Sequence, residues 1–338
     1  MSRGALVGAL LAVLAAGCDG ERRAPEPAGA PPRPAPAPAP TPTPAPAPAD
    51  ADRSYVLPAA PRIVALGDLH GDLAATRAAL RLAGATDEGG RWAGGTLVLV
   101  QTGDEIDRGD HDRAIIDLFD RLAEEARAAG GAVHALNGNH EIMNVQGDFR
   151  YVTEGSFKEF DGSTFADPSS PVLGRVPERA RARAAAFAPG GPYAKKLAAR
   201  PVILMVGDTV FAHAGVLPAH ARYGAGKINR EVQAWMSGAT RTPPAVVTAE
   251  DGPVWTRRYG GADLGPDDCE VLSRALGALG ARRMVVGHTV QKGGITSACG
   301  DRVWRIDVGM SAYYGGRPEA LEIAGESIRI LKSDAAPR

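Results

Sequence analysis

The sequence has few cysteines, no cationic block and no apolar segment at its start that is long enough to cross a membrane. Its three cysteines lie away from the polar motifs described below, so the candidate ligands in those motifs are oxygen and nitrogen atoms. Lysine and arginine number 38 against 39 aspartate and glutamate, a formal net charge of −1. This balance argues against a nucleic-acid-binding protein and against a basic membrane-surface patch.

The N-terminal segment has the layout of an export signal. Met1-Ser2-Arg3 is a short basic start, and the apolar run from Ala5 to Ala16 is shorter than the roughly 20 residues that a transmembrane helix needs. The run ends in Gly17-Cys18, which resembles a bacterial lipobox. We therefore expect residues 1–17 to be a lipoprotein signal peptide and Cys18 to be the lipidated residue. A cleaved signal without lipidation is the alternative.

Residues 18–53 are expected to form a disordered Ala/Pro-rich tether. Alternating alanine and proline offer too little apolar surface to offset the entropy of folding, and they favour extended polyproline conformations. About 30 such residues at roughly 3.1 Å each would reach about 90 Å. We expect a protein of the bacterial cell envelope, lipid-anchored and facing the periplasm or the exterior, with the membrane leaflet left open. The alternative for residues 18–53 is a loose tail without a role, which would also lie outside the folded domain.

Residues 54–333 hold the folded part of the chain. Short apolar runs that end in glycine and a polar residue alternate with segments of helical spacing, which predicts an α/β layered fold. Such sheets bind ligands in the loops at the carboxyl ends of their strands. Strands are expected over 62–66, 96–100, 132–136, 202–206, 209–213, 283–286 and 303–308, with a strand pair over 320–331; helices are expected over 73–83 and 115–129.

Residues 144–200 differ in character from the rest of this part of the chain. They contain an Asp-Pro-Ser-Ser-Pro turn cluster at 167–171 and a helix-prone run near 178–186. We interpret the segment as a cap-like insertion beside the site, with a plain surface excursion as the alternative. Cys269 and Cys299 lie outside it, and the sequence leaves open whether they pair.

Short sequence motifs that contain glycine, called phrases below, hold the candidate functional residues of the chain. A Gly-Asp at a strand end is often a plain turn, and a lone histidine is more often structural, so each phrase is weak by itself. Together they offer carboxylate, imidazole and amide ligands for two metal ions, which a hydrolase holds about 3.5–4 Å apart around the attacking and leaving oxygens of a phosphate ester. The phrases are Gly67-Asp68-Leu69-His70-Gly71, Gly103-Asp104-Glu105-Ile106-Asp107-Arg108-Gly109, Gly138-Asn139-His140-Glu141, Phe211-Ala212-His213-Ala214-Gly215 and Gly287-His288-Thr289.

Taken in order, these phrases resemble those of the calcineurin-like metallophosphoesterases, and most closely the phosphoprotein phosphatase branch. Val254-Trp255-Thr256-Arg257-Arg258-Tyr259 and the compact length are similar to the Shewanella-like phosphatases within that branch. The resemblance extends over most of residues 62–310. It implies an α/β fold of the metallophosphoesterase type, a layered β-sandwich flanked by helices (αββα), with a helical or irregular insertion.

The resemblance also implies the metal ligands. Two divalent or trivalent ions are expected, with manganese first and iron or zinc as alternatives. Thr289 and Val290 stand where the wider superfamily often has a further histidine, which matches the phosphatase branch and leaves the first metal more open. Asp68 and His70 would hold the first ion, Asp104 would bridge both ions, and Asn139, His213 and His288 would complete the second.

By the same resemblance, a metal-bridging hydroxide attacks phosphorus directly, and side chains of the chain handle the proton and the phosphate. His140 is the expected acid for the leaving group, and Asp107 would orient it. Arg108 would bind phosphate oxygens, and Arg257 would do so as well, with Arg258 as its competitor. Asp112 is left out of the site as a helix cap or a solvated loop acid. Tyr313 and Tyr314 would line the pocket, or they would only pack against neighbouring side chains.

The predicted function is therefore hydrolysis of phosphate monoesters. The expected substrates are phosphorylated proteins, with tyrosine or serine/threonine unresolved, or small phosphoesters, and the expected membrane contact is the N-terminal lipid anchor. A dinucleoside tetraphosphate or nucleotide phosphohydrolase is the alternative within the enzyme class. A non-catalytic envelope-binding lipoprotein is the alternative outside it, although degenerate relatives usually lose a ligand and all six are present here.

Overall fold

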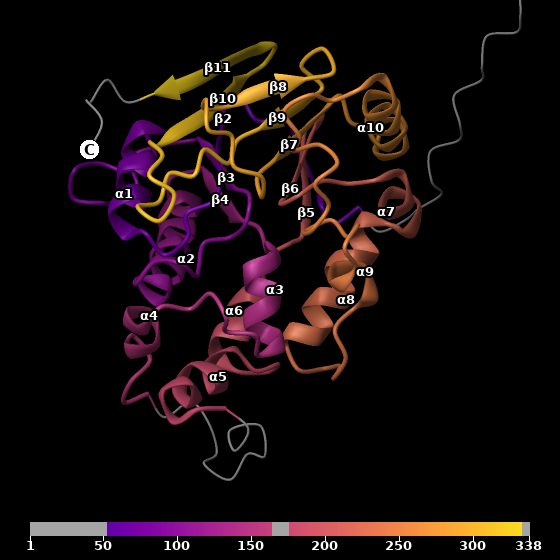
Figure 1. Cartoon of the computed structure of the whole chain (residues 1–338). Helices are drawn as coiled ribbons and strands as arrows, with labels where there is room; N and C mark the ends of the chain where they lie inside the picture. The colour runs from indigo at the N-terminus through magenta and orange to yellow at the C-terminus, as the bar shows by residue number, and fades with distance from the viewer. Residues whose placement is uncertain (1–52, 164–175, 333–338) are drawn as a thin grey trace, which may run out of the picture. The chain divides into compact units, whose positions relative to one another are not determined.

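The structure of the chain, a computed structural model, describes residues 53–163 and 176–332. Its strands form two β-sheets with helices on both sides (Figure 1). The six-stranded sheet has the order β1 (Val56–Leu57), β5 (Ile203–Val206), β6 (Thr209–Ala212), β7 (Arg283–Val286), β9 (Val303–Arg305), β8 (Thr296–Ala298). The five-stranded sheet has the order β11 (Ser327–Lys332), β10 (Glu319–Ala324), β2 (Ile63–Leu66), β3 (Val98–Gln101), β4 (Ala132–Ala135).

The described helices lie on different sides of the strands according to their position in the chain. Figure 1 shows α1 and α2 on one side of the strands and α7 to α10 on the other. Their bounds are α1 (Leu73–Leu82), α2 (Asp112–Ala128), α3 (Asn139–Gln146), α4 (Glu154–Lys158), the 3₁₀ helix η2 (Glu178–Ala180), α5 (Arg181–Phe187), α6 (Pro192–Ala198), α7 (Pro218–Tyr223), α8 (Ala225–Met236), α9 (Ala245–Thr248) and α10 (Pro266–Leu279).

The strands of the six-stranded sheet divide their apolar side chains between two cores. Leu204 and Phe211 pack with residues of the five-stranded sheet, whereas Val210 and Met284 pack with the helices on the opposite face. This alternation is the period of two that a strand imposes on its side chains. The sheets therefore share one core between them, and Trp235 of α8 and Leu272 of α10 belong to the other core.

The five-stranded sheet is covered on its outer face by α1 and α2. All four residues of β2 are buried, as expected for a strand between two apolar layers. Leu80 of α1 and Ile115 and Leu122 of α2 belong to the same core as β2. The order of layers is helix, sheet, sheet, helix, which confirms the predicted αββα sandwich.

The parallel strands place the candidate site residues at the edge of the sheets where the carboxyl ends of these strands lie. In one sheet β2, β3 and β4 are parallel, and in the other β6, β7 and β9 are parallel. Asp68, Asp104, Asn139, His213 and His288 all follow the carboxyl ends of these strands. The two sheets bring their ligand loops together at that edge, where α/β sheets bind ligands.

The expected strands and the first two helices are present, with ends shifted by a few residues. The expected strand over 303–308 is shorter, because β9 ends at Arg305. The 3₁₀ helix η2 and α5 coincide with the helix-prone run near 178–186, whereas the longer helices α8 and α10 are not among the predicted elements. The turn cluster at 167–171 lies outside the described residues. Within the described part of the chain, no helix has both the length and the apolar character to span a bilayer.

The pairing that the sequence left open is present. A disulfide joins Cys269, in the first turn of α10, to Cys299, between β8 and β9, with the two Cα atoms 5.3 Å apart. This separation lies in the usual range for a disulfide. The bond fixes the N-terminal end of α10 to the edge of the six-stranded sheet.

Candidate metal centre and active site

Three candidate ligands, Asn139, His213 and His288, lie close together beside the carboxylate of Asp104. His213 Nε2 lies 3.3 Å from Asp104 Oδ2, 2.9 Å from Asn139 Oδ1 and 3.1 Å from His288 Nδ1. The other ring nitrogen of His213 lies 3.0 Å from the carbonyl oxygen of Thr102. If that nitrogen, Nδ1, carries the proton, Nε2 presents its lone pair to the space between the candidate ligands. Ligand atoms of Asp104, His213 and His288 all lie within 4.8 Å of one another, close enough to share one ion.

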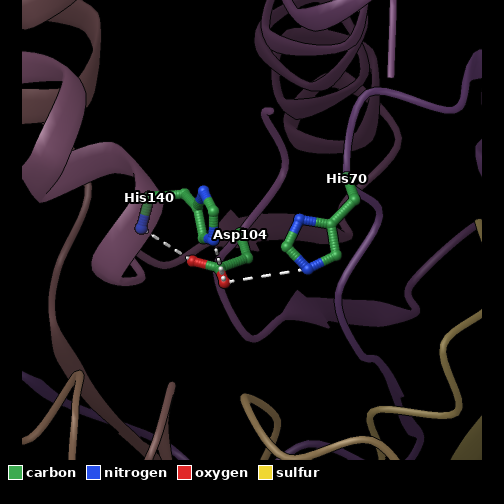
Figure 2. Close-up of side chains that lie close together, drawn as sticks. All are labelled: His70, Asp104 and His140. Atoms are coloured by element: carbon green, nitrogen blue, oxygen red, sulfur yellow. Dashed lines mark hydrogen bonds and ion pairs between the residues drawn. The ribbon is translucent and has the colours of Figure 1, made fainter. Parts of the chain in front are cut away.

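A second group lies on the other side of Asp104. His70 Nε2 is 3.8 Å from Asp68 Oδ2 and 3.9 Å from Asp104 Oδ2. Figure 2 shows the Asp104 carboxylate between the rings of His70 and His140, and ligand atoms of these three residues also lie within 4.8 Å of one another. The carboxylate of Asp104 thus borders both groups, the position of a bridging ligand.

Arg108 occupies the ligand side of His70 in this conformation. Its Nη1 lies 2.7 Å from His70 Nε2, the atom that would bind a metal. One lone pair cannot accept from a guanidinium and bind a metal ion together, so metal binding at His70 requires Arg108 to turn away.

The charges of the site favour cations. Asp68, Asp104 and Asp307 are each at most 2% exposed, and one oxygen of Asp307, Oδ2, is buried without a hydrogen-bond partner. Burial raises the pKa of Asp68, and the carboxylates of Asp307 and Asp104 raise it further. Burial also raises the pKa of Asp307 to about 6. Buried, mutually repelling carboxylates are stabilised by bound metal ions, so the donor set fits the ions that the motifs predict.

His288 and His70 have lowered pKa values, which favour the neutral form. Burial and the neighbouring His213 lower the pKa of His288 to about 3. Burial likewise places the pKa of His70 well below its usual range. Neutral imidazole is the metal-binding form of histidine.

The ligand loops depend on unusual backbone geometry. Among the described residues, five of the seven non-glycine residues with positive φ belong to the site phrases: His70, Asp104, Asp107, Arg108 and His288. Such conformations cost about 1–3 kcal/mol each and concentrate at functional sites. In these phrases the functional residues themselves, and not only glycines, adopt positive φ.

Two glycines are needed for close approach rather than for φ. A Cβ atom on Gly138 would collide with the Asp104 carboxylate, and one on Gly287 would collide with that of Asp68. Each glycine lets the backbone of one ligand loop pack directly against a carboxylate of another. The glycines of the phrases thus bring the loops close enough to share ligands.

His140 and Asp107 form the pair that the resemblance implied. His140 Nδ1 lies 2.6 Å from Asp107 Oδ2, and both side chains are almost fully buried. Burial alone would lower the pKa of His140, but the carboxylates of Asp104 and Asp107 outweigh it and raise this pKa. His140 Nε2 faces Asp104 Oδ2 at 3.8 Å, so the ring stands beside the metal ligands.

A cavity of about 440 Å³ opens over this site. Arg257 lines it and donates to Thr289 Oγ1 at 3.2 Å, whereas Arg258 pairs with Asp268 at 3.1 Å. The guanidinium carbon of Arg108 lies 5.1 Å from the ring centre of Tyr151 and 5.2 Å from that of Tyr314. The residues that line the cavity are Asp104, Arg108, Asn139, His140, Met143, Gln146, Asp148, Arg150, Tyr151, Trp255, Arg257, His288, Val290 and Tyr314.

Two residues at the site, Asp307 and Glu141, are not among the functional residues that the sequence motifs predict. Asp307 follows β9 as Asp68 follows β2, so the strand-then-aspartate pattern could have found it. Glu141 belongs to a recognised phrase, and its carboxylate accepts from the backbone N–H groups of Asp104, Glu105 and Gly138 at 2.7–2.9 Å. It thereby connects the loop after β3 to the start of α3.

The expectation for Asp112 is wrong in part. Asp112 begins α2, but it is buried rather than solvated. It accepts from the backbone N–H of Asp107 at 3.0 Å and from Arg183 at 2.7 Å. No local pattern in the sequence indicates this contact, because Arg183 is 71 residues away.

A family model of calcineurin-like phosphoesterases matches residues 61–292. The chain belongs to the calcineurin-like phosphoesterase family. Shewanella-like protein phosphatase 2 of Arabidopsis thaliana is 40% identical over 305 residues, covering 81% of this chain and 78% of that protein. Shewanella-like protein phosphatase 1 of Plasmodium berghei (strain Anka) is 27% identical over 282 residues, covering 80% and 74%.

Solved structures share the fold. The cold-active protein-tyrosine phosphatase of a psychrophilic Shewanella species aligns with a TM-score of 0.65 at 24% identity, covering 82% of each chain. A protein serine/threonine phosphatase of Saccharomyces cerevisiae aligns with a TM-score of 0.53 at 14% identity, covering 84% of each chain. The resemblance drawn from the motifs is confirmed, and the chain is a metal-dependent phosphatase of the Shewanella-like type.

Proposed function

We propose that this phosphatase hydrolyses phosphate monoesters on proteins. The observation that carries the proposal is that Asp104, Asn139 and His288 line the same cavity as His140, Arg108 and Arg257. Candidate metal ligands, a candidate acid and two candidate phosphate-binding cations thus face one space. This is the set of groups that a phosphoryl transfer to water requires.

Each residue has a proposed role. Asp68 and His70 would hold one ion, Asn139, His213 and His288 the other, and Asp104 would lie between the two. When bound, the ions would lower the pKa of water and so provide the nucleophile at neutral pH.

The chain's own residues would move the proton and hold the phosphate. His140 would protonate the leaving oxygen from Nε2, while Asp107, 2.6 Å from Nδ1, orients the ring. Arg108 and Arg257 would each present paired N–H donors to phosphate oxygens. Arg108 would reach the phosphate after leaving His70 Nε2, where it lies at 2.7 Å.

The cavity wall supports a phosphotyrosyl substrate. Tyr151, Tyr314 and Trp255 line the cavity, and Tyr313 is 63% exposed beside Tyr314. Aromatic rings favour offset or edge-to-face contact with another ring. An aryl phosphate would gain such contacts, and a serine phosphate would not.

Manganese is the proposed resident metal. Carboxylate, amide and imidazole donors suit manganese, and they suit iron and zinc as well. Reloading the metal-free protein with each ion separately would distinguish these metals.

We also propose that the chain is exported and lipid-anchored at Cys18. The support is the basic start, the short apolar run and the lipobox-like Leu14-Ala15-Ala16-Gly17-Cys18. Intact-mass analysis of the protein from bacterial membranes should find the N-terminus at Cys18 with acyl chains. An unprocessed Met1, or a mature N-terminus without lipid, would overturn this assignment.

The substrate is tested with the metal-loaded protein on phosphotyrosyl and phosphoseryl peptides of one sequence and on a dinucleoside tetraphosphate. We expect hydrolysis of the peptides, with kcat/KM higher for phosphotyrosine. Faster hydrolysis of the dinucleotide would favour the nucleotide alternative. Hydrolysis of none of the three by protein with full metal content would favour a binding lipoprotein.

A further inference from the structure

Arg183 of α5 is buried in the core next to the candidate acid. Its side chain has no exposed surface, although it carries a charge. Its guanidinium carbon lies 4.8 Å from the ring centre of Phe187 and 5.4 Å from that of Phe160. A buried arginine is costly unless its N–H groups and its charge find partners.

Every branch of this guanidinium has a partner. Nε donates to Asn144 Oδ1 at 2.9 Å, and Nη1 donates to Ser156 Oγ at 2.7 Å. Nη2 donates to Asp112 Oδ2 at 2.7 Å and to Asp107 Oδ1 at a longer 3.4 Å. Arg183 therefore stands between two buried carboxylates and compensates their charge.

These contacts determine which oxygen of Asp107 faces the acid. Oδ1 accepts from Arg183 and also from Asn144 Nδ2, at 3.0 Å. The other oxygen, Oδ2, is left to His140 Nδ1 at 2.6 Å. Asn144 Nδ2 also donates to the carbonyl oxygen of His140 at 2.9 Å, so one amide holds both members of the pair.

The backbone of Asp107 is held by the same cluster. Asp107 has a φ of 70°, a conformation that non-glycine residues rarely adopt. Its N–H donates to Asp112 Oδ1 at 3.0 Å, and the other oxygen of Asp112 accepts from Arg183. Arg183 thus acts on Asp107 in two ways, directly at the carboxylate and through Asp112 at the backbone.

We propose that Arg183 is a positioning residue for proton donation, which holds Asp107 so that the His140 ring faces the leaving oxygen. The inference rests on the proposed function, in which His140 is the acid. It gives residues of α5 and α4 a part in the chemistry, although none of them lines the cavity. Arg183 does not touch the substrate, so its loss should change proton donation and leave phosphate binding intact.

The test compares two substrates that differ in their need for an acid. Phenyl phosphate has a poor leaving group that must be protonated, whereas 2,4-dinitrophenyl phosphate has a leaving group that departs without a proton. His140→Asn provides the reference: it should lose about 100-fold or more in kcat on phenyl phosphate and far less on the dinitrophenyl ester.

Arg183→Met should show the same selectivity, with a loss of about 10-fold or more on phenyl phosphate, at most about threefold on the dinitrophenyl ester, and an unchanged KM. Arg183→Lys keeps the charge and should recover part of the activity on phenyl phosphate. Arg283→Met is the matched control, because Arg283 is also buried but begins β7, at the end of the strand away from the site. It should not distinguish between the two substrates.

The outcomes separate this inference from the proposed function. An equal loss on both substrates for Arg183→Met, with the selective loss retained in His140→Asn, would overturn the role of Arg183. An equal loss for His140→Asn would overturn the acid assignment itself. If Arg183→Met does not fold, Asn144→Ala removes a second contact to the same oxygen of Asp107 and should show the selective loss; absence of selectivity there would also overturn the inference.

Discussion

Asn139 Oδ1 lies 2.9 Å from His213 Nε2, although the two residues are 74 positions apart and follow strands of different sheets. Asn139 begins α3 after β4, and His213 follows β6. The candidate metal centre is therefore assembled across the sandwich. The packing of the two sheets against each other determines the geometry of the centre, which connects the apolar core to catalysis.

Replacement of Asp104 tests whether one carboxylate serves both ions. Asp104→Asn keeps the size of the side chain but removes the charge that lies between His70 and His213. Because loss of even an indirect ligand contact typically costs 10–100-fold, we expect activity to fall by more than about 100-fold. Metal content measured by mass spectrometry should fall in parallel, with the circular dichroism spectrum unchanged. Appreciable remaining activity would contradict the two-metal assignment.

The neighbouring residues Arg257 and Arg258 form a matched pair for phosphate binding. Arg257 lines the cavity, whereas Arg258 pairs with Asp268 at 3.1 Å. A hydrogen bond to a charged group contributes about 1.5–3 kcal/mol, so Arg257→Ala should lower kcat/KM by about tenfold or more. Arg258→Ala should change it by less than about twofold. Steady-state kinetics on one phosphopeptide would check both, and the reverse ranking would transfer the role to Arg258.

The disulfide should contribute to stability and not to chemistry. Cys269 and Cys299 are separated by 30 residues, and closing a loop of that length stabilises a fold by about 3–4 kcal/mol in the chain-entropy model. The double variant Cys269→Ser/Cys299→Ser should therefore unfold at lower denaturant concentration. Its kcat at 25 °C should match that of the parent chain. A denaturation midpoint equal to the parent's would show that the bond adds nothing.

Much of the fold could be predicted from local patterns. Buried strands such as β2 and β3 are short apolar runs that end in Gly-Asp or close to it, and α2 has apolar residues at helical spacing. Helix α10 was missed although Pro266 begins it and Gly280, at φ 69°, ends it. Those two signals are the ones that typically mark the ends of a helix, so this element could have been found.

The site was predictable where the motifs are local and not where it depends on distant contacts. Asp104 and Asp107 lie in one motif, and the spacing between them is enough to predict that both belong to the site. Arg183 reaches Asp107 from 76 positions away, and nothing in its surroundings, an alanine-rich helix, distinguishes it from a surface arginine. Its burial is decided by tertiary packing against Phe160 and Phe187, which the sequence pattern does not contain.

Metal titration of the purified chain tests the central claim most directly. The protein would be stripped of metal with a chelator, reloaded with manganese in steps and assayed on a phosphotyrosyl peptide, with bound metal counted at each step. Two ions per chain and activity that rises with the second equivalent are the predicted result. Full activity with one ion per chain, or in the metal-free protein, would contradict a two-metal phosphatase.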